Sequence, residues 1–136
     1  MSTNWVTDIN KMHTKYGVHE WVKTAPQEHL KEFLKFRLDF INEELQESLK
    51  AFDEKDPEEI VDGLLDICVV AIGTLDAFKI DGHKGWDKIL EANMAKEVGV
   101  KEGRPNPLGL PDLIKPEGWQ APSHEGNHGL LGEIFE

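Results

Sequence analysis

The sequence has a single cysteine, Cys68, and no apolar run long enough to cross a membrane. One cysteine excludes a disulfide within the chain, and its apolar neighbours predict a buried, unreactive thiol. A membrane span needs about 20 consecutive apolar residues, and the first residues lack the basic region and apolar stretch of a signal peptide. We therefore expect a cytoplasmic protein without membrane contact.

Basic residues are scarce as well. The chain has 15 Lys and Arg against 26 Asp and Glu, which gives a formal net charge of −11. Such a surface repels polyphosphate at long range, so the composition argues against a protein that coats DNA or RNA. The 136 residues, 39% of them hydrophobic, are enough for the core of one domain. A small anion that arrives with a metal ion remains compatible with this charge.

The first hundred residues carry apolar side chains at helical spacing, and no alternating run requires a β-sheet. We expect an all-α fold with helices over about 6–15, 27–52, 57–75 and 86–97. The second helix has an apolar stripe that predicts its core face: Leu34, Leu38, Ile41, Leu45, Leu49 and Phe52. On the fourth helix the inner side is expected to carry Trp86, Leu90, Asn93 and Met94.

Residues typical of helix starts support the bounds of the two central helices. Pro26 suits the first turn of the second helix. Asp56, Pro57 and Glu59 suit the N-cap, the first helical position and the capping box of the third. Glu59 therefore has a structural explanation of its own.

Glycine and proline become frequent after Gly99 and break any regular period. We expect a helical domain over residues 1–100 and an irregular tail over 101–136. The tail keeps many apolar side chains, so it is expected to pack on its own helices or on a partner subunit.

Two pairs of carboxylates are the main candidates for chemistry. Glu44 and Glu47 lie three residues apart on the second helix, and Asp62 and Asp66 lie four apart on the third, so each pair shares one side of its helix. If these helices pack together, four like charges meet and need a compensating cation. Oxygen ligands favour Mg²⁺ or Mn²⁺, which can bridge phosphate oxygens and activate a water. The pattern predicts a metal site for phosphoanhydride hydrolysis.

Ordinary solvated helix faces also carry acidic residues, so each pair alone has a simpler explanation. Asp62 and Asp66, however, lie in the most apolar helix, where burying a charged side chain without a partner costs free energy. Glu43 points nearly away from the apolar stripe and is given a lesser role. The rival interpretation is a helical adaptor whose acidic stripe forms salt bridges to a basic protein, without turnover.

Several segments in combination resemble a known family: 43–47, 62–66, Gly73 with Thr74, and 91–96. The chain is similar to the all-α nucleoside triphosphate pyrophosphohydrolases, which include MazG, HisE and the dimeric dUTPases. The turn at 115–119 resembles the phage-type MazG-like branch, including the MazZ enzymes. Many MazG relatives carry Glu-x-x-Asp on the second of the acidic helices. Glu59 and Asp62 match this literally, but the place of Asp66 before the apolar run suits the ligand aspartate better.

The resemblance implies a MazG-like bundle of about four helices that forms a homodimer or homotetramer. It implies two or more Mg²⁺ or Mn²⁺ ions per site and the conversion of a (d)NTP to (d)NMP and pyrophosphate, in the host cytoplasm if the protein is phage-encoded. A purine nucleotide such as dGTP, GTP or dATP is the favoured substrate. A dUTP/dCTP pyrophosphatase and a phosphoribosyl-ATP pyrophosphohydrolase are the alternatives within enzymes.

Site roles follow from the resemblance by position. The metal ligands would be Glu44, Glu47, Asp62 and Asp66, with Glu43 and Glu59 as secondary candidates. One carboxylate that the metals do not fully engage would take the proton of the attacking water.

Phosphates would be reached from two other places in the chain. Asn93 and Lys96 lie three apart on the fourth helix and would contact the phosphates. Arg37 lies two turns before Glu44 on the same flank, where a phosphate contact and a salt bridge to the acidic cluster are equally compatible with the spacing.

Other candidate residues are given lesser weight. His124 to His128 spells the zinc-protease pattern His-Glu-x-x-His, but Gly126 and Asn127 inside it and Pro122 before it argue against the helix that the motif needs. The remaining histidines share no spacing and receive no role: His13, His19, His29 and His83. Three aromatic residues could stack on a base but occur more often in cores: Trp21, Phe33 and Phe40.

Overall fold

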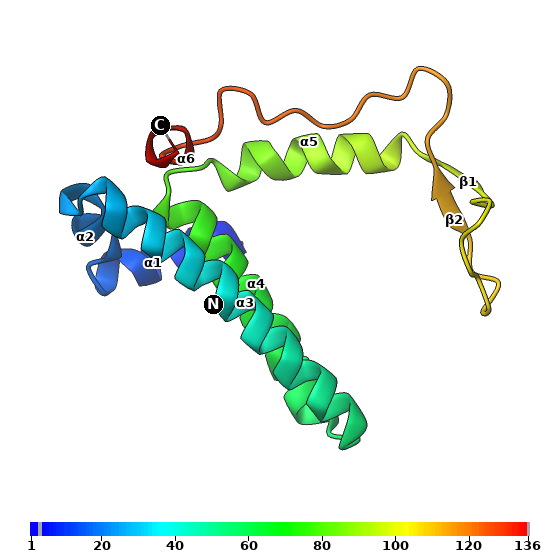
Figure 1. Cartoon of the computed structure of the whole chain (residues 1–136), viewed down its shortest axis with the longest axis horizontal. Helices are drawn as coiled ribbons and strands as arrows, with labels where there is room; N and C mark the ends of the chain where they lie inside the picture. The colour runs from blue at the N-terminus through cyan, green and yellow to red at the C-terminus, as the bar shows by residue number, and fades with distance from the viewer. Residues whose placement is uncertain (3, 136) are drawn as a thin grey trace. The chain divides into compact units, whose positions relative to one another are not determined.

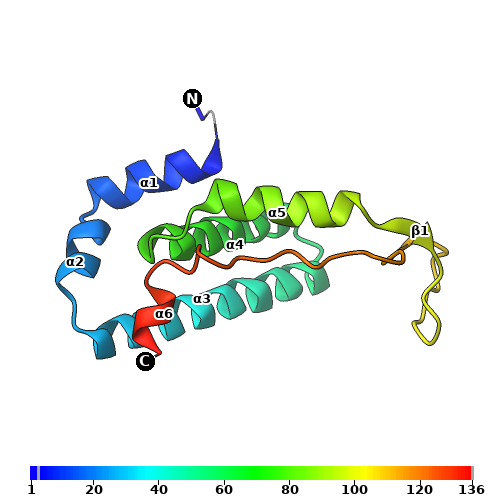
Figure 2. The same ribbon diagram turned by 90° about the horizontal axis from the view of Figure 1, so that it is seen from above.

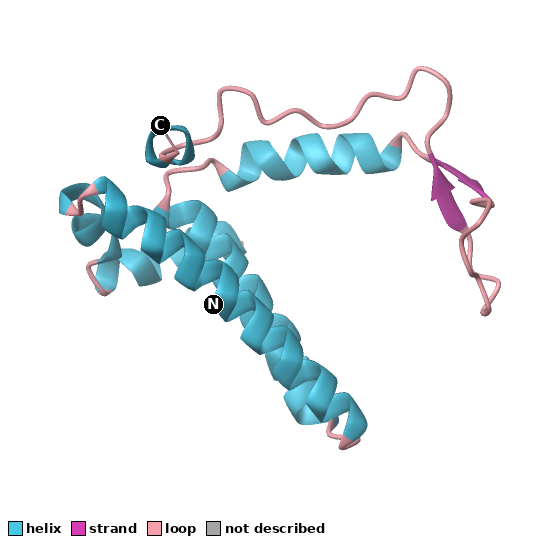
Figure 3. Ribbon diagram, viewed as in Figure 1, coloured by secondary structure: helices cyan, strands magenta, loops and turns pink. Residues whose placement is uncertain are grey.

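The computed structural model describes residues 1–2 and 4–135, and these are mostly helical (Figure 3). This confirms the all-α prediction. The helices are α1 Trp5–Lys15, α2 Val18–Thr24, α3 Gln27–Asp53, α4 Pro57–Ala77, α5 Gly82–Met94 and α6 Leu131–Ile134. Two short strands, β1 Glu97–Gly99 and β2 Asp112–Ile114, complete the elements. No helix in the described ranges is long and apolar enough to cross a membrane.

The chain forms two compact units. Unit 1 comprises residues 1–82 and 126–136, and unit 2 comprises residues 83–125. These units differ from the expected division at residue 100, which stays a prediction about independent domains.

A long antiparallel pair of helices, α3 and α4, is the main feature of unit 1 (Figures 1 and 2). Residues 54–56 connect the two helices, and the start of α4 is capped. Asp56 accepts a hydrogen bond at its side chain from the backbone N–H of Glu59, as predicted for an N-cap, and Pro57 occupies the first turn of α4. The backbone N–H of Asp56 donates to the carbonyl of Ala51 at 2.9 Å. In a capping box the side chain of Glu59 would accept from this N–H, which therefore already has another partner.

The core of unit 1 lies where α2, the start of α3, the end of α4 and α6 meet. Phe78 and Ile134 are its largest fully buried side chains, packed with Val22, Leu30 and Ala77. The C-terminal residues Leu130 to Ile134 are thus part of this core.

Three hydrogen bonds hold the C-terminal segment against residues 78–81, which follow α4. Asn127 is buried, and its side chain both accepts from the backbone N–H of Asp81 at 2.8 Å and donates to the carbonyl of Asp81 at 2.9 Å. The backbone N–H of Leu130 donates to the carbonyl of Phe78 at 2.8 Å. The bond to Phe78 satisfies a carbonyl at the C-terminal end of α4, and the two bonds to Asp81 satisfy backbone groups just before α5.

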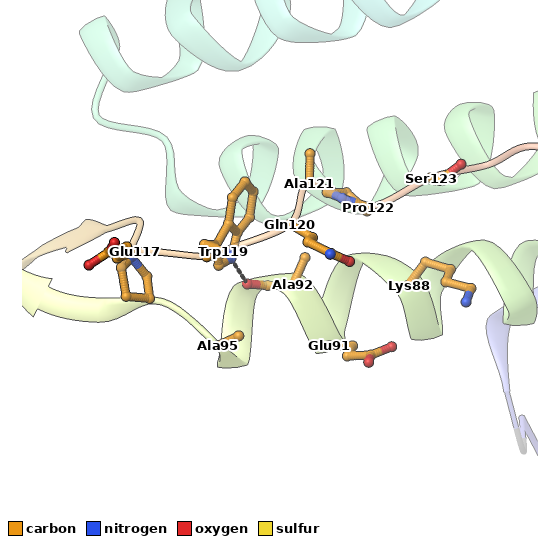
Figure 4. Close-up of a pocket in the computed structure, with 12 residues that line it drawn as sticks. Lys88, Glu91, Ala92, Ala95, Glu117, Trp119, Gln120, Ala121, Pro122 and Ser123 are labelled. Carbon is orange, nitrogen blue, oxygen red and sulfur yellow. Dashed lines mark hydrogen bonds between the residues drawn. The ribbon is translucent and has the colours of Figure 1, made fainter.

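Unit 2 consists of α5, the antiparallel β1 and β2 hairpin and the extended segment after it. Glu97 pairs with Ile114, Val98 with Leu113, and Gly99 with Asp112. The indole of Trp119 donates to the carbonyl of Ala92 at 2.8 Å, which satisfies an acceptor in the last turn of α5 (Figure 4).

Several expected details are wrong. Pro26 is the N-cap residue of α3 and not part of its first turn. The helix expected at 86–97 begins at Gly82 and ends at Met94, and its expected inner residues Trp86, Leu90, Asn93 and Met94 are exposed. The elements α2, α6 and the hairpin were not expected, because each is too short to show a period.

The expected core stripe of α3 is also largely exposed. Leu38 is 52% exposed, Leu45 45%, Leu49 51% and Phe52 70%. Within the described residues of unit 1, α4 is the helix that packs along this part of α3, and a single neighbouring helix covers one side of α3. On α4 the apolar Val61, Leu64 and Leu65 are exposed too, although this helix was expected to be covered on most sides.

Candidate functional site

Gly63 on α4 packs closely against Ser48 on α3. A Cβ atom on Gly63 would overlap Oγ of Ser48 and lie 3.8 Å from the backbone carbonyl oxygen of Glu44. Ser48 is held by its own hydrogen bond, Oγ to the carbonyl of Glu44 at 2.8 Å. The absence of a side chain at residue 63 therefore brings the two helices together at the level of the acidic residues.

The acidic residues of α3 and α4 lie close enough to repel one another. Burial raises the pKa of Glu44, and repulsion by Glu47, Asp66, Asp62 and Glu43 raises it further. Glu44 and Asp66 are half-buried, and the other three are exposed. The predicted ligands thus form one acidic group across two helices.

Within the described part of the chain, Glu44, Glu47, Asp62 and Asp66 form no ion pair with a basic side chain within 4.0 Å. No three of these carboxylates have oxygen atoms that all lie within 4.8 Å of one another. A set of carboxylates without a basic partner is the donor set that hard divalent cations prefer. These residues therefore fit Mg²⁺ or Mn²⁺, and their role as ligands stays a prediction.

The two secondary candidates differ in position. Glu43 is exposed, and its charge acts on Glu44. Glu59 is exposed in the first turn of α4, where its backbone N–H bonds the N-cap residue Asp56.

Arg37 extends from α3 to the backbone of α4. Its Nε donates to Oγ1 of Thr74 at 3.2 Å, and its Nη2 donates to the carbonyl of Val70 at 3.1 Å. Arg37 forms no salt bridge within 4.0 Å to any acidic residue that the structure describes. Desolvation by burial lowers the pKa of its guanidinium group. A fixed, half-buried cation without a carboxylate partner can bind an anion.

In unit 2, a cavity of about 500 Å³ lies between α5 and the segment 116–123. Figure 4 shows Lys88 and Glu91 on α5 and Trp119 on the facing segment. Lys96 and Lys115 both place their ammonium groups over the Trp119 ring, at 5.5 and 5.0 Å from its centroid. Asn93 is exposed on α5. Contact of Asn93 and Lys96 with phosphates stays a prediction.

A cluster that the sequence did not indicate joins α1, α2 and α4. His13 Nδ1 and His19 Nε2 lie 2.8 and 2.7 Å from the same oxygen, Oδ2 of Asp76. Asn10 donates to the other oxygen, Oδ1, at 2.9 Å. The two histidines are six residues apart with a turn at Gly17 between them, and Asp76 is far away in sequence, so no helical period could have indicated the cluster.

Two further expectations concern aromatic and histidine residues. Phe33 lies between Trp21, at a centroid distance of 5.1 Å, and the core residue Phe78, at 5.8 Å. Phe33 is therefore a core contact, and Phe40 packs edge-on against Phe36. The segment from His124 to His128 forms no helix.

Comparison with known protein families gives a match to the central helices of the chain. The model of the phosphoribosyl-ATP pyrophosphohydrolase family matches residues 18–93, more than half of the 136 residues. The match spans α2, α3, α4 and most of α5, and thus includes all the acidic candidates. No curated protein matches significantly. The chain therefore belongs to the phosphoribosyl-ATP pyrophosphohydrolase family, within the all-α nucleoside triphosphate pyrophosphohydrolases, and is a nucleotide hydrolase acting on phosphoanhydride bonds.

Proposed function

We propose that this enzyme converts a (d)NTP to (d)NMP and pyrophosphate with the help of Mg²⁺ or Mn²⁺. The observation that carries this proposal is the acidic group on α3 and α4, in which burial, and then repulsion by its acidic neighbours, raises the pKa of Glu44. A bound divalent cation would offset that repulsion, and it would explain why the four carboxylates form no ion pair with a basic side chain among the described residues.

The metal ligands are Glu44, Glu47, Asp62 and Asp66. When bound, the cations supply charge neutralisation for the phosphate oxygens and polarise the attacking water. Glu43 lies beside this group and Glu59 in the first turn of α4, so both are secondary ligands in this proposal. The carboxylate that is least engaged by the cations accepts the proton of the attacking water.

Arg37 binds the substrate's phosphate oxygens in this proposal. Its two hydrogen bonds to α4 hold the guanidinium in one orientation, and its position seven residues before Glu44 corresponds to about 10 Å along α3. A triphosphate can span such a distance between a metal-bound end and a guanidinium. The alternative role, a salt bridge to the acidic group, is not supported by the ion pairs of the described residues.

Asn93 and Lys96 provide further phosphate contacts. Lys96 and Lys115 bring two positive charges close to one indole ring, and a bound anion would offset the repulsion between them. This supports a role for Lys96 in phosphate binding, and Asn93 precedes it by one helical turn.

A purine triphosphate is the substrate that we favour, on the resemblance of the 115–119 turn to MazZ-like enzymes. The second candidate is phosphoribosyl-ATP, because the matching family is described by that activity. A pyrimidine substrate, dUTP or dCTP, is the third. All of these share a phosphoanhydride chain, so the proposed cation and phosphate contacts serve each of them.

The test is pyrophosphate release from a panel of these nucleotides, with Mg²⁺, with Mn²⁺ and with EDTA. We expect activity that requires a divalent cation and disappears in Asp66→Asn, while Glu58→Gln, an exposed residue of the same helix, retains it. Metal-independent turnover, or full activity of Asp66→Asn, would refute the proposal. Relative rates across the panel decide between the substrates.

An acidic adaptor is the non-enzymatic rival, and calorimetry separates it from the proposed enzyme. The enzyme should bind Mn²⁺ in the absence of any protein partner, and Asp62→Asn together with Asp66→Asn should weaken that binding. An adaptor would bind a basic protein and show no such metal site.

We also propose that the active form is a homodimer or homotetramer. The apolar residues Leu38, Leu45 and Leu49 follow one side of α3 at spacings of seven and four, and each is about half exposed. Large exposed apolar patches mark interaction surfaces. Sedimentation should show a dimer or tetramer that Leu45→Glu dissociates; a fully active wild-type monomer would contradict the proposal.

A further inference from the structure

Three side chains of unit 1 that have no role in the proposed reaction bring metal-ligating atoms close together. Nδ1 of His13, Nε2 of His19 and Oδ2 of Asp76 lie within 4.8 Å of one another. Asp76 follows Asp66 by ten residues, about 15 Å along α4. We propose that His13, His19 and Asp76 form a second cation site, for a transition metal of the Zn²⁺ class.

Both histidine nitrogens of the cluster are directed at one carboxylate oxygen. Nε2 of His19 lies 2.7 Å from Oδ2 of Asp76, and Nδ1 of His13 lies 2.8 Å from the same atom. A proton between nitrogen and oxygen satisfies each of these contacts, and so does a cation that binds all three atoms. The hydroxyl of Thr14 donates to the carbonyl of Asn10 at 2.9 Å and also lies 3.3 Å from Nδ1 of His19, the nitrogen on the other side of the ring.

A bound cation can take the place of the protons in these contacts. In the cation-bound form, Nε2 of His19, Nδ1 of His13 and Oδ2 of Asp76 would all direct lone pairs at the metal, and both nitrogens would be free of protons. Cation binding therefore releases or relocates protons, which makes it weaker at acidic pH.

The ring nitrogen and the carboxylate oxygen that would not bind the metal have polar partners of their own, as is usual in metal centres. Asn10 donates to Oδ1 of Asp76, the oxygen that faces away from the histidines, and Thr14 contacts the outer nitrogen of His19. Metal-bound histidines and carboxylates usually have such partners, which fix their orientation. The side chains of His13, His19 and Asp76 are 5%, 33% and 10% exposed, so the site is shielded but reachable beside His19.

The donor set selects the class of metal. Two imidazole nitrogens and one carboxylate suit Zn²⁺ and its neighbours, whereas Mg²⁺ prefers oxygen ligands. Ligand atoms around tetrahedral Zn²⁺ stand about 3.3 Å apart for bonds of about 2.0 Å. The contacts of 2.7 and 2.8 Å must therefore widen by roughly half an ångström, a shift that side-chain rotation can supply. A water would complete the coordination.

The experiment measures Zn²⁺ binding to the full chain after removal of metals with a chelator. Competition against a chromophoric chelator, with excess Mg²⁺ present, gives affinity and stoichiometry. We expect one ion per chain, and affinity lowered at least about tenfold by His19→Ala and by Asp76→Asn. His29→Ala, an exposed histidine of α3, and Cys68→Ser should bind as the wild type does. The pair Asp62→Asn and Asp66→Asn should also leave Zn²⁺ affinity unchanged, which separates this site from the proposed catalytic one.

Two further readouts guard against a variant that misfolds. Co²⁺ bound at this site should give the visible absorption of nitrogen and oxygen ligands, and Thr14→Val, which keeps all three ligands, should weaken binding without removing the spectrum. Circular dichroism checks the helical content of each variant. Absence of binding in the wild type, or equal affinity of folded His19→Ala and His29→Ala, would overturn the proposal and identify the cluster as a hydrogen-bonded network without a metal.

Discussion

The guanidinium of Arg37 lies directly against Gly73, so that a Cβ atom at residue 73 would overlap Nη2. The same Cβ atom would stand 3.2 Å from Cε1 and Nε2 of His13. The missing side chain of Gly73 thus lets a cation from α3 and an imidazole from α1 both approach the backbone of α4. This contact links the proposed phosphate-binding residue to the histidine cluster.

Gly73→Ala should move Arg37 without unfolding the protein, because the end of an arginine side chain is flexible. The loss of its charge-assisted contact with phosphate should raise KM for the triphosphate about tenfold, with a smaller effect on kcat. Steady-state kinetics measures this. Gly132→Ala, at a position with no atom within 4 Å of the added methyl group, is the control. An unchanged KM would mean that Arg37 does not contact the substrate.

Gly63→Ala should destabilise the chain only while Ser48 is present. The methyl group overlaps Oγ of Ser48 and costs about 1–3 kcal/mol, which exceeds the gain of about 1 kcal/mol from replacing glycine in a helix. In a Ser48→Ala background the overlap disappears, and the same change should stabilise the chain by up to about 1 kcal/mol. Urea unfolding of the four proteins gives the coupling energy. Additive effects would contradict the close contact.

Without divalent cations, the stability of the chain should fall as pH rises above the ordinary glutamate value. The pKa of Glu44 is raised from 4.5, so the folded state holds this proton more tightly than the unfolded state does. Its contribution to the free energy of unfolding is therefore present below about pH 4.5 and is lost as pH rises through the raised pKa. Unfolding in EDTA at a series of pH values measures the slope.

Glu44→Gln should remove that part of the pH dependence, because glutamine does not titrate. Added Mn²⁺ should reduce it in the wild type, because a bound cation offsets the repulsion by the neighbouring carboxylates. Glu58→Gln, at the start of α4, serves as the matched control. Parallel pH profiles for the wild type and Glu44→Gln would show that the acidic group does not strain the folded chain.

Truncation of Ile134 should destabilise unit 1 strongly, although the residue is near the end of the chain. Ile134 is 2% exposed and packs with Phe78, so Ile134→Ala should cost about 2–5 kcal/mol. Its neighbour Phe135 is 63% exposed, and Phe135→Ala should cost far less. Thermal unfolding compares the two. Equal losses of Tm would argue against the docked position of α6.

The sequence by itself determines the long helices and the acidic pairs. Helical spacing and the signals at Asp56 and Pro57 predict α3 and α4, because a long period and a capped start are local properties of the chain. The same spacing places Glu44 with Glu47, and Asp62 with Asp66, on one side of each helix. The family resemblance carried by these segments is confirmed by the match over residues 18–93.

Only the tertiary structure decides which apolar residues are covered and which distant polar residues meet. Leu38 and Leu49 have the spacing of core residues yet remain exposed, since burial depends on a neighbour that periodicity does not specify. His13 and Asp76 stand 63 positions apart and share a 2.8 Å contact only because α1 packs on α4. Helical periodicity reports the side of a helix on which a residue lies, whereas a site between helices depends on packing.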